Sequence, residues 1–89
     1  MNSLFKEDIK NGTFTIDFSK INKCKGVLML EVKPFDINDS LVLNGSNKLI
    51  TADNPFLIQT NHPIVNGSQL VFKTPNKAQK TIVRMLLVE

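Results

Sequence analysis

Asn-Gly pairs and prolines divide this chain into short segments, and this punctuation is the feature that most constrains its fold. Asn-Gly occurs at Asn11, Asn44 and Asn66. Both residues tolerate positive φ, so the pair is typical of a tight reversal between antiparallel strands. Prolines remove a backbone donor and mark further strand ends or loops. The four prolines are Pro34, Pro55, Pro63 and Pro75. The apolar runs between these markers are about four to eight residues long, which suits strands better than helices.

Two of these segments carry the clearest strand patterns. Residues 13–19 alternate polar and apolar side chains, so Phe14, Ile16 and Phe18 share one face that we expect to be buried. Residues 26–33 are apolar on both faces until Glu31. A strict period of two places Val27 and Met29 opposite Leu28, Leu30 and Val32. This segment is therefore predicted to be a central strand or one covered on both sides.

The other segments predict a hairpin, further short strands and one short helix. Residues 41–43 and 48–52 flank Asn44 and Gly45 and are expected to form the hairpin. Ser3 is a suitable N-cap for a helix of one or two turns over residues 4–10, with Asn11-Gly12 as its end. Leu4, Phe5 and Ile9 would form its apolar side. The remaining strands are predicted at residues 56–60, 64–65, 69–74 and 81–88.

These elements predict one all-β domain that spans residues 1–89. A chain of this length supports a single core. About seven short strands, separated by turns rich in Asn, Gly and Pro, are typical of a compact antiparallel sandwich or barrel. No apolar run approaches the roughly 20 residues of a membrane span. Charged residues from Lys6 to Lys10 also interrupt the region where a signal peptide has its apolar core. We therefore expect a cytoplasmic protein that is not secreted by a signal peptide.

The charge balance leaves nucleic-acid binding as an alternative function. The net charge is +3, and the first 44 residues carry equal numbers of acidic and basic side chains, so the surplus lies later. In this alternative, cations contact the phosphate backbone while Phe56 or Phe72 stacks on bases. The cations are Lys73, Lys77, Lys80 and Arg84. However, the chain has no Tyr or Trp, and a solvated lysine-rich hairpin explains the same residues.

Residues that could support catalysis or metal binding are few. His62, the single histidine, lies between Asn61 and Pro63, where a turn explains it. Cys24 lies between two lysines, whose charges would activate an exposed thiol, but a structural cysteine at the start of a strand is the alternative. We therefore predict no catalytic, cofactor or metal site, and no enzyme activity.

One segment partly matches a calcium-binding loop. Asp36, Asn38 and Ser40 occupy its first, third and fifth positions. Leu41 stands where the loop needs glycine, and Asn47 stands where it needs a bidentate glutamate. The match therefore fails. Four Asn-x-Ser/Thr sequons, at Asn11, Asn38, Asn44 and Asn66, are likewise interpreted as turn chemistry.

The most informative functional feature is a charge-poor segment. Residues 40–72 contain only Lys48 and Asp53 as charged side chains. Interface cores are depleted in charge but keep Asn, Gln, Ser and Thr, so this composition favours a protein-protein contact surface. The alternative is that residues 40–72 are charge-poor because they form two central strands of the domain and neutral turns. Residues 81–88 are apolar on both faces and so need a second layer, or a partner's sheet to which the strand adds an edge. The candidate interface residues are Phe56, Leu57, Ile58, Ile64, Val65, Ile82, Leu86 and Val88.

In size, strand density, Asn and Lys usage and lack of catalytic motifs, the chain resembles the small auxiliary proteins of tailed phages that sit on capsids or tails. The resemblance implies a non-enzymatic structural protein of the virion that forms symmetric oligomers, often trimers, at symmetry points of a shell. The expected partners are therefore copies of the chain itself and a larger protein assembly such as a capsid. An inhibitor that binds a host enzyme would use the same kind of surface and is the third hypothesis.

Overall fold

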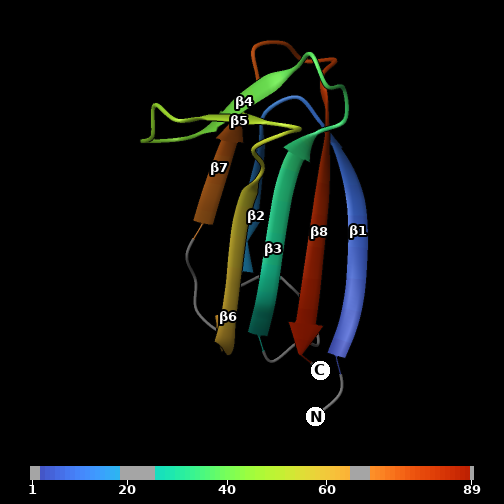
Figure 1. Ribbon diagram of the computed structural model, residues 1–89, viewed down its shortest axis with the longest axis vertical. Coiled ribbons are helices and arrows are strands. Elements are labelled where there is room, and N and C mark those ends of the chain that lie inside the picture. The colour runs from blue at the N-terminus through green and yellow to red at the C-terminus, as the bar shows by residue number, and fades with distance from the viewer. Residues whose placement is uncertain (1–2, 19–25, 65–68, 89) are drawn as a thin grey trace.

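The computed structural model describes residues 3–18, 26–64 and 69–88. These residues form eight strands in two antiparallel four-stranded sheets that pack face to face (Figure 1). The prediction of an all-β sandwich or barrel is confirmed, and the fold is a sandwich with eight strands instead of about seven. None of the described residues belongs to a helix long and apolar enough to cross a membrane.

The first sheet, here called the long sheet, is built from four nine-residue strands. Their order across the sheet is β1, β8, β3, β6. β8 therefore lies in the middle, between β1 and β3 (Figure 1). The strands are β1 (Ser3–Asn11), β3 (Gly26–Pro34), β6 (Phe56–Ile64) and β8 (Lys80–Val88).

The second sheet, here called the short sheet, has strands of three to five residues in the order β2, β7, β4, β5. The strands are β2 (Phe14–Asp17), β4 (Ser40–Leu43), β5 (Leu49–Thr51) and β7 (Gln69–Lys73). The short sheet packs on one face of the long sheet, and no other strand of residues 3–18, 26–64 and 69–88 covers the opposite face.

The short N-terminal helix expected over residues 4–10 is wrong, since this segment is strand β1. All nine residues of β1 pair with β8, from Ser3 opposite Val88 to Asn11 opposite Lys80. An isolated helix of one or two turns is marginal in water, because its nucleus is costly. Nine cross-strand pairs with a remote segment outweigh the local capping signal of Ser3.

Only one of the three Asn-Gly pairs is shown to close a hairpin. Asn44 and Gly45 join β4 to β5 as expected, with Gly45 at φ +89° and Leu41 opposite Ile50. Asn11 and Gly12 instead carry the chain from β1 in the long sheet to β2 in the short sheet. The sequence therefore predicts a turn at Asn11 and Gly12, but it does not predict that this turn connects strands of different sheets. The third pair, Asn66-Gly67, lies outside the described residues.

Residues 56–64 form one strand, β6, where the sequence predicted a break between Asn61 and Pro63. Two features let the strand continue through Pro63. β6 is an edge strand, so one side of its backbone needs no ladder partner. Pro63 also lies between Gln59 and Ile64, where the register with β3 shifts.

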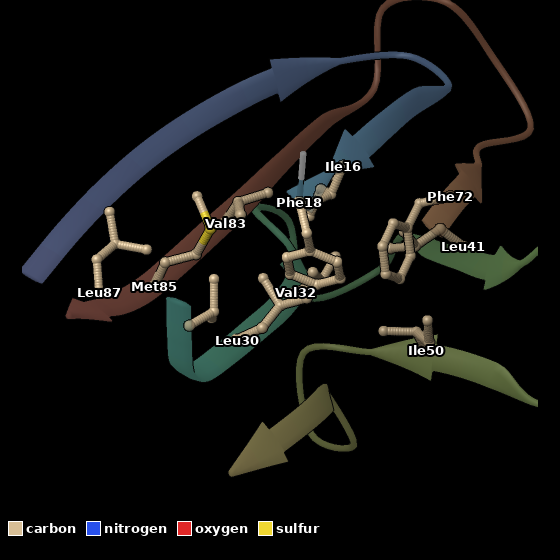
Figure 2. Packing of buried hydrophobic residues seen from close by; sticks show 11 residues of the cluster. Ile16, Phe18, Leu30, Val32, Leu41, Ile50, Phe72, Val83, Met85 and Leu87 are labelled. Carbon is tan, nitrogen blue, oxygen red and sulfur yellow. The ribbon is translucent and has the colours of Figure 1, made fainter. Parts of the chain in front are cut away.

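The core lies between the two sheets, and Figure 2 shows its side chains converging from both. Phe72 is at its centre, fully buried, with Phe14 stacked at 5.3 Å and Phe56 edge-on at 5.2 Å between ring centroids. The expected inward face of residues 13–19 is confirmed by Ile16 and Phe18. The core residues are Ile16, Phe18, Val27, Leu30, Val32, Leu41, Ile50, Phe72, Val83, Met85 and Leu87.

The expected faces of β3 need one correction. Val27 was assigned to the face opposite Leu30 and Val32, but all three are buried in the core. The cause is a register irregularity between Val27 and Met29, which shifts the alternation by one residue. The expectation that β3 is a central strand is confirmed, because it pairs with both β6 and β8.

Candidate functional site

The outer face of the long sheet is the candidate functional surface. On β8, the residues Val83, Met85 and Leu87 point into the core, so alternation turns Ile82, Arg84 and Leu86 outward. Cross-strand partners of these residues share their face. They form three rows: Phe5, Leu86, Met29 and Gln59; then Glu7, Arg84, Glu31 and Leu57; then Ile9, Ile82 and Lys33.

The middle row contains an ion triad that joins three strands. The Nε of Arg84 donates to Oε2 of Glu7 at 2.6 Å, and a terminal guanidinium nitrogen donates to Oε1 of Glu31 at 3.0 Å. The hydrogen bond with Glu7, followed by that with Glu31, raises the pKa of Arg84 above its ordinary value. The guanidinium therefore stays charged, and it ties β1 and β3 to β8 on this face.

Apolar side chains surround this triad. Phe5, Ile9 and Leu57 are 57%, 51% and 53% exposed. Leu86 and Ile82 are half-buried between their neighbours on β1 and β3. The face thus presents apolar side chains on both sides of a central, carboxylate-paired arginine. Arg, Met and aromatic side chains are enriched in interface cores, where Lys, Glu and Asp are depleted. Both glutamates of the triad are paired with Arg84.

The structure distributes the candidate interface residues over different environments. Leu57, Ile82 and Leu86 lie on the outer face. Phe56 and Ile58 point inward and pack against the core. Val88 is only 1% exposed, so it is buried by its own chain and is not available to a partner. Val65 and the side chain of Ile64 lie outside the described residues.

The sequence reasoning missed the contribution of β1 to this face. Phe5 and Ile9 were assigned to the apolar side of a helix, whereas in β1 they lie opposite Leu86 and Ile82. The sequence signal for a strand here is the spacing of Phe5, Glu7 and Ile9 by two residues. The charges of Lys6, Asp8 and Lys10 on the alternate positions do not distinguish this pattern from an exposed helix.

The expectation that the C-terminal strand adds an edge to a partner's sheet also needs correction. β8 is hydrogen-bonded on both sides, to β1 and to β3, so it has no free edge. The edges of the long sheet are β1 and β6 instead. The outward side chains of β8 remain part of the candidate face, because pairing of the backbone does not cover them.

The charge-poor segment 40–72 is divided between core and surface. Leu41, Ile50 and Phe72 are buried, as the alternative interpretation expected. Leu49 and Leu57 are 57% and 53% exposed and line a hollow of about 330 Å³ between the β4–β5 hairpin and β6. The composition of this segment therefore reflects the core in part, and an exposed apolar surface in part.

The residues of the nucleic-acid alternative do not form one surface. Lys73, Lys77 and Lys80 are exposed, but Arg84 is held by two carboxylates on the outer face of the long sheet. Phe72 is 0% exposed, so it cannot stack on a base. Phe56 packs edge-on against Phe72 within the sandwich. The aromatic contacts that this alternative needs are therefore used by the core.

The residues considered for catalysis or metal binding are placed as follows. Asp36 accepts a hydrogen bond from the backbone N–H of Asn38 at 2.8 Å, as aspartates in turns commonly do. Within residues 3–18, 26–64 and 69–88, no three His, Cys, Asp or Glu side chains come together to hold a metal ion. Cys24 and the side chain of His62 lie outside the described residues.

Comparisons of the chain with protein-family models, with curated proteins and with solved structures find no match. The functional interpretation therefore depends on the geometry of the outer face and of the strand edges.

Proposed function

We propose that this protein is a non-enzymatic assembly module that acts through protein-protein contacts made by the outer face of the long sheet. In its particular form, it is a small auxiliary or decoration protein of a phage particle, as the sequence resemblance implies. The observation that carries the proposal is the group of apolar side chains around the Arg84 triad, of which Phe5, Ile9 and Leu57 are exposed and Ile82 and Leu86 are half-buried. Exposed apolar patches of this kind are typical of interaction surfaces.

The chemistry of the face suits a protein partner. Arg84 is already paired with Glu7 and Glu31, so covering the face does not leave an isolated buried cation. Phe5, Leu57 and Ile9 supply exposed apolar area around it. A central arginine within an apolar surround is the arrangement that concentrates binding energy in many interfaces.

The expected partners are copies of the chain, trimeric if the phage resemblance holds, and a larger assembly such as a capsid.

Substitution of Leu86 by aspartate tests the proposal. Leu86 is half-buried on the outer face between Phe5 and Met29, so a carboxylate there puts an unpaired charge into any contact made by this face. We expect size-exclusion chromatography with light scattering to give a mass above 10.0 kDa for the wild type and a smaller mass for Leu86→Asp than for the wild type.

The matched control is Ile37→Asp. Ile37 is 68% exposed, but it lies in the turn between β3 and β4, away from the outer face. This variant should keep the mass of the wild type, and circular dichroism should show that both variants stay folded. A wild type that remains monomeric at high concentration, or a Leu86→Asp variant that assembles normally, would contradict the proposed function.

A further inference from the structure

Strand β1 presents the longest regular free edge of the described sandwich. It lies first in the order of the long sheet, and its nine residues pair with β8 without a register shift. β6, the opposite edge, has an irregular register with β3. The edges of the short sheet are only four and three residues long, in β2 and β5. A long edge without a bulge is the best template for pairing with another strand.

Two backbone hydrogen bonds show which groups of β1 face this free edge. The N–H of Gly12 donates to the carbonyl of Gln79 at 2.8 Å, and the N–H of Phe35 donates to the carbonyl of Lys80 at 3.0 Å. Odd-numbered residues of β8 therefore bond to β1, and even-numbered residues bond to β3. By the same alternation, Phe5, Glu7 and Ile9 direct their own N–H and C=O groups outward from β1.

The inner side of this edge carries charges that restrict what can pair with it. Lys6, Asp8 and Lys10 share this side and line a hollow of about 690 Å³ between β1 and β2. Asp8 lies 3.7 Å from the ammonium group of Lys10. Inward charges on an edge strand normally prevent pairing. A strand that carries the opposite charge at the facing position removes that obstacle.

We infer that β1 pairs with β1 of a second copy of this chain, antiparallel and centred on Glu7. The inference rests on the proposed assembly function and names one partner and one register for it. In this register all nine residues of β1 are paired. Lys6 faces Asp8 of the second copy, and Phe5 faces Ile9 of the second copy, each twice because of the two-fold axis.

Backbone geometry, charge and the number of paired residues together select this register. Antiparallel pairing places residues with outward backbone groups opposite each other, so the two-fold axis must pass through a residue. An axis at Lys6 places Lys6 opposite itself. An axis at Asp8 places Asp8 opposite itself and Lys6 opposite Lys10. An axis at Glu7 brings opposite charges together at positions 6 and 8. It also places the two Glu7 residues opposite each other, but each Glu7 carboxylate is paired with Arg84 of its own chain at 2.6 Å. An axis at Ile9 brings Asp8 and Lys10 together, but it pairs only residues 7–11 of β1.

The pairing also extends the candidate surface. Two long sheets would join into one continuous eight-stranded sheet, in the order β6, β3, β8, β1 and then the same strands reversed. Phe5 and Ile9 lie on the outer face, so the apolar rows of the two copies would become continuous across the two-fold axis. The dimer would then present twice the area of outer face to a further partner.

Charge reversal at positions 6 and 8 tests the inference by sedimentation equilibrium. Lys6→Glu places a second carboxylate opposite Asp8, and Asp8→Lys places like ammonium groups opposite each other. Each variant alone should weaken the dimer by about tenfold. An equimolar mixture of the two variants should restore the dimer, because both facing pairs are then of opposite charge. Neither a folding defect nor a general charge effect predicts this recovery.

A disulfide measures the register directly. In a Cys24→Ser background, Glu7→Cys should form an intermolecular disulfide, because a hydrogen-bonded pair places its Cα atoms about 5.5 Å apart. Lys6→Cys and Asp8→Cys serve as controls for the two other registers. Stronger cross-linking through either control than through Glu7→Cys would overturn the inference.

The outcomes separate this inference from the proposed function. A wild type that assembles and is disrupted by Leu86→Asp, but not by Lys6→Glu or Asp8→Lys, would overturn the edge pairing and leave the outer face as the interface. Recovery in the mixture, together with normal association of Leu86→Asp, would support the edge dimer and remove the outer face. A wild type that is monomeric up to about 1 mM would overturn the edge dimer.

Discussion

At the scale of single residues, two buried polar side chains mark the entry into β8. Gln79 and Thr81 are 4% and 0% exposed. The Nε2 of Gln79 donates to the carbonyl of Ser40 at 2.8 Å, which links the start of β8 to β4 in the other sheet. The Oγ1 of Thr81 has no hydrogen-bond partner among the described residues. A buried hydroxyl without a partner lowers stability.

We therefore expect Thr81→Val to raise the free energy of unfolding by about 1 kcal/mol, since it keeps the shape and removes the unpaired hydroxyl. Urea unfolding followed by circular dichroism measures the change. Thr15→Val is the control, because Thr15 is exposed on β2 and should give a change within about 0.5 kcal/mol. A loss of stability in Thr81→Val would show that its hydroxyl is satisfied.

Alanine substitutions at Gly12 and Gly45 can distinguish the cost of backbone strain from the cost of a steric clash. Both have positive φ, +67° and +89°. A Cβ at Gly12 would lie 3.1 Å from the carbonyl oxygen of Lys77, while a Cβ at Gly45 would meet nothing within 4 Å. Gly12→Ala should therefore lower the free energy of unfolding by more than the roughly 1–2 kcal/mol of left-handed strain, and Gly45→Ala by about that amount. Equal losses in urea unfolding would contradict the steric part.

At the scale of elements, β1 depends on contacts with residues far away in the chain. Glu7 and Arg84 are 77 positions apart, yet their 2.6 Å contact fixes β1 against β8. No pattern within residues 3–11 indicates that partner. The local signals, Ser3 as an N-cap and Asn11-Gly12 as a stop, therefore predict a short helix instead. The hairpin of β4 and β5 contrasts with it, because its two strands are joined by the Asn44-Gly45 turn itself.

Removal of the Arg84 charge should loosen β1. In Arg84→Met, we expect faster hydrogen exchange at the amides of Lys6 and Asp8, which bond to β8 by the alternation of the ladder. The exchange of β4 and β5 amides should not change. Arg84→Lys keeps the charge but loses the two-sided guanidinium geometry, so it should fall between the wild type and Arg84→Met. Unchanged protection of β1 in Arg84→Met would show that the triad does not hold the strand.

At the scale of the whole molecule, the unequal sheets determine what is available for assembly. The short sheet covers the inner face of the long sheet and forms the core with it. The outer face and the edge of β1 remain uncovered by the described residues. Of the candidate interface residues, Leu57 is exposed and Ile82 and Leu86 are half-buried on the outer face, whereas Val88 is buried and Phe56 belongs to the sandwich interior.

The proposed face and edge contacts both concern surfaces of the whole molecule. Leu86→Asp probes the face of the long sheet, and charge reversal at Lys6 and Asp8 probes its edge. The two surfaces are adjacent, because Phe5 lies on the outer face and also directs its backbone toward the free edge. An assembly that used both would need the edge pair first to make the apolar rows continuous.

The amino-acid sequence by itself determined the all-β class, the inward face of residues 13–19 and the hairpin at Asn44-Gly45. These features depend on alternation and turn chemistry, which act between neighbours in the chain. Only the tertiary structure decided that residues 3–11 form a strand, that β8 has both edges paired, and that Arg84 is bound by Glu7 and Glu31. Those features depend on pairing between distant segments, and strand pairing is selected by the energy of the whole sheet.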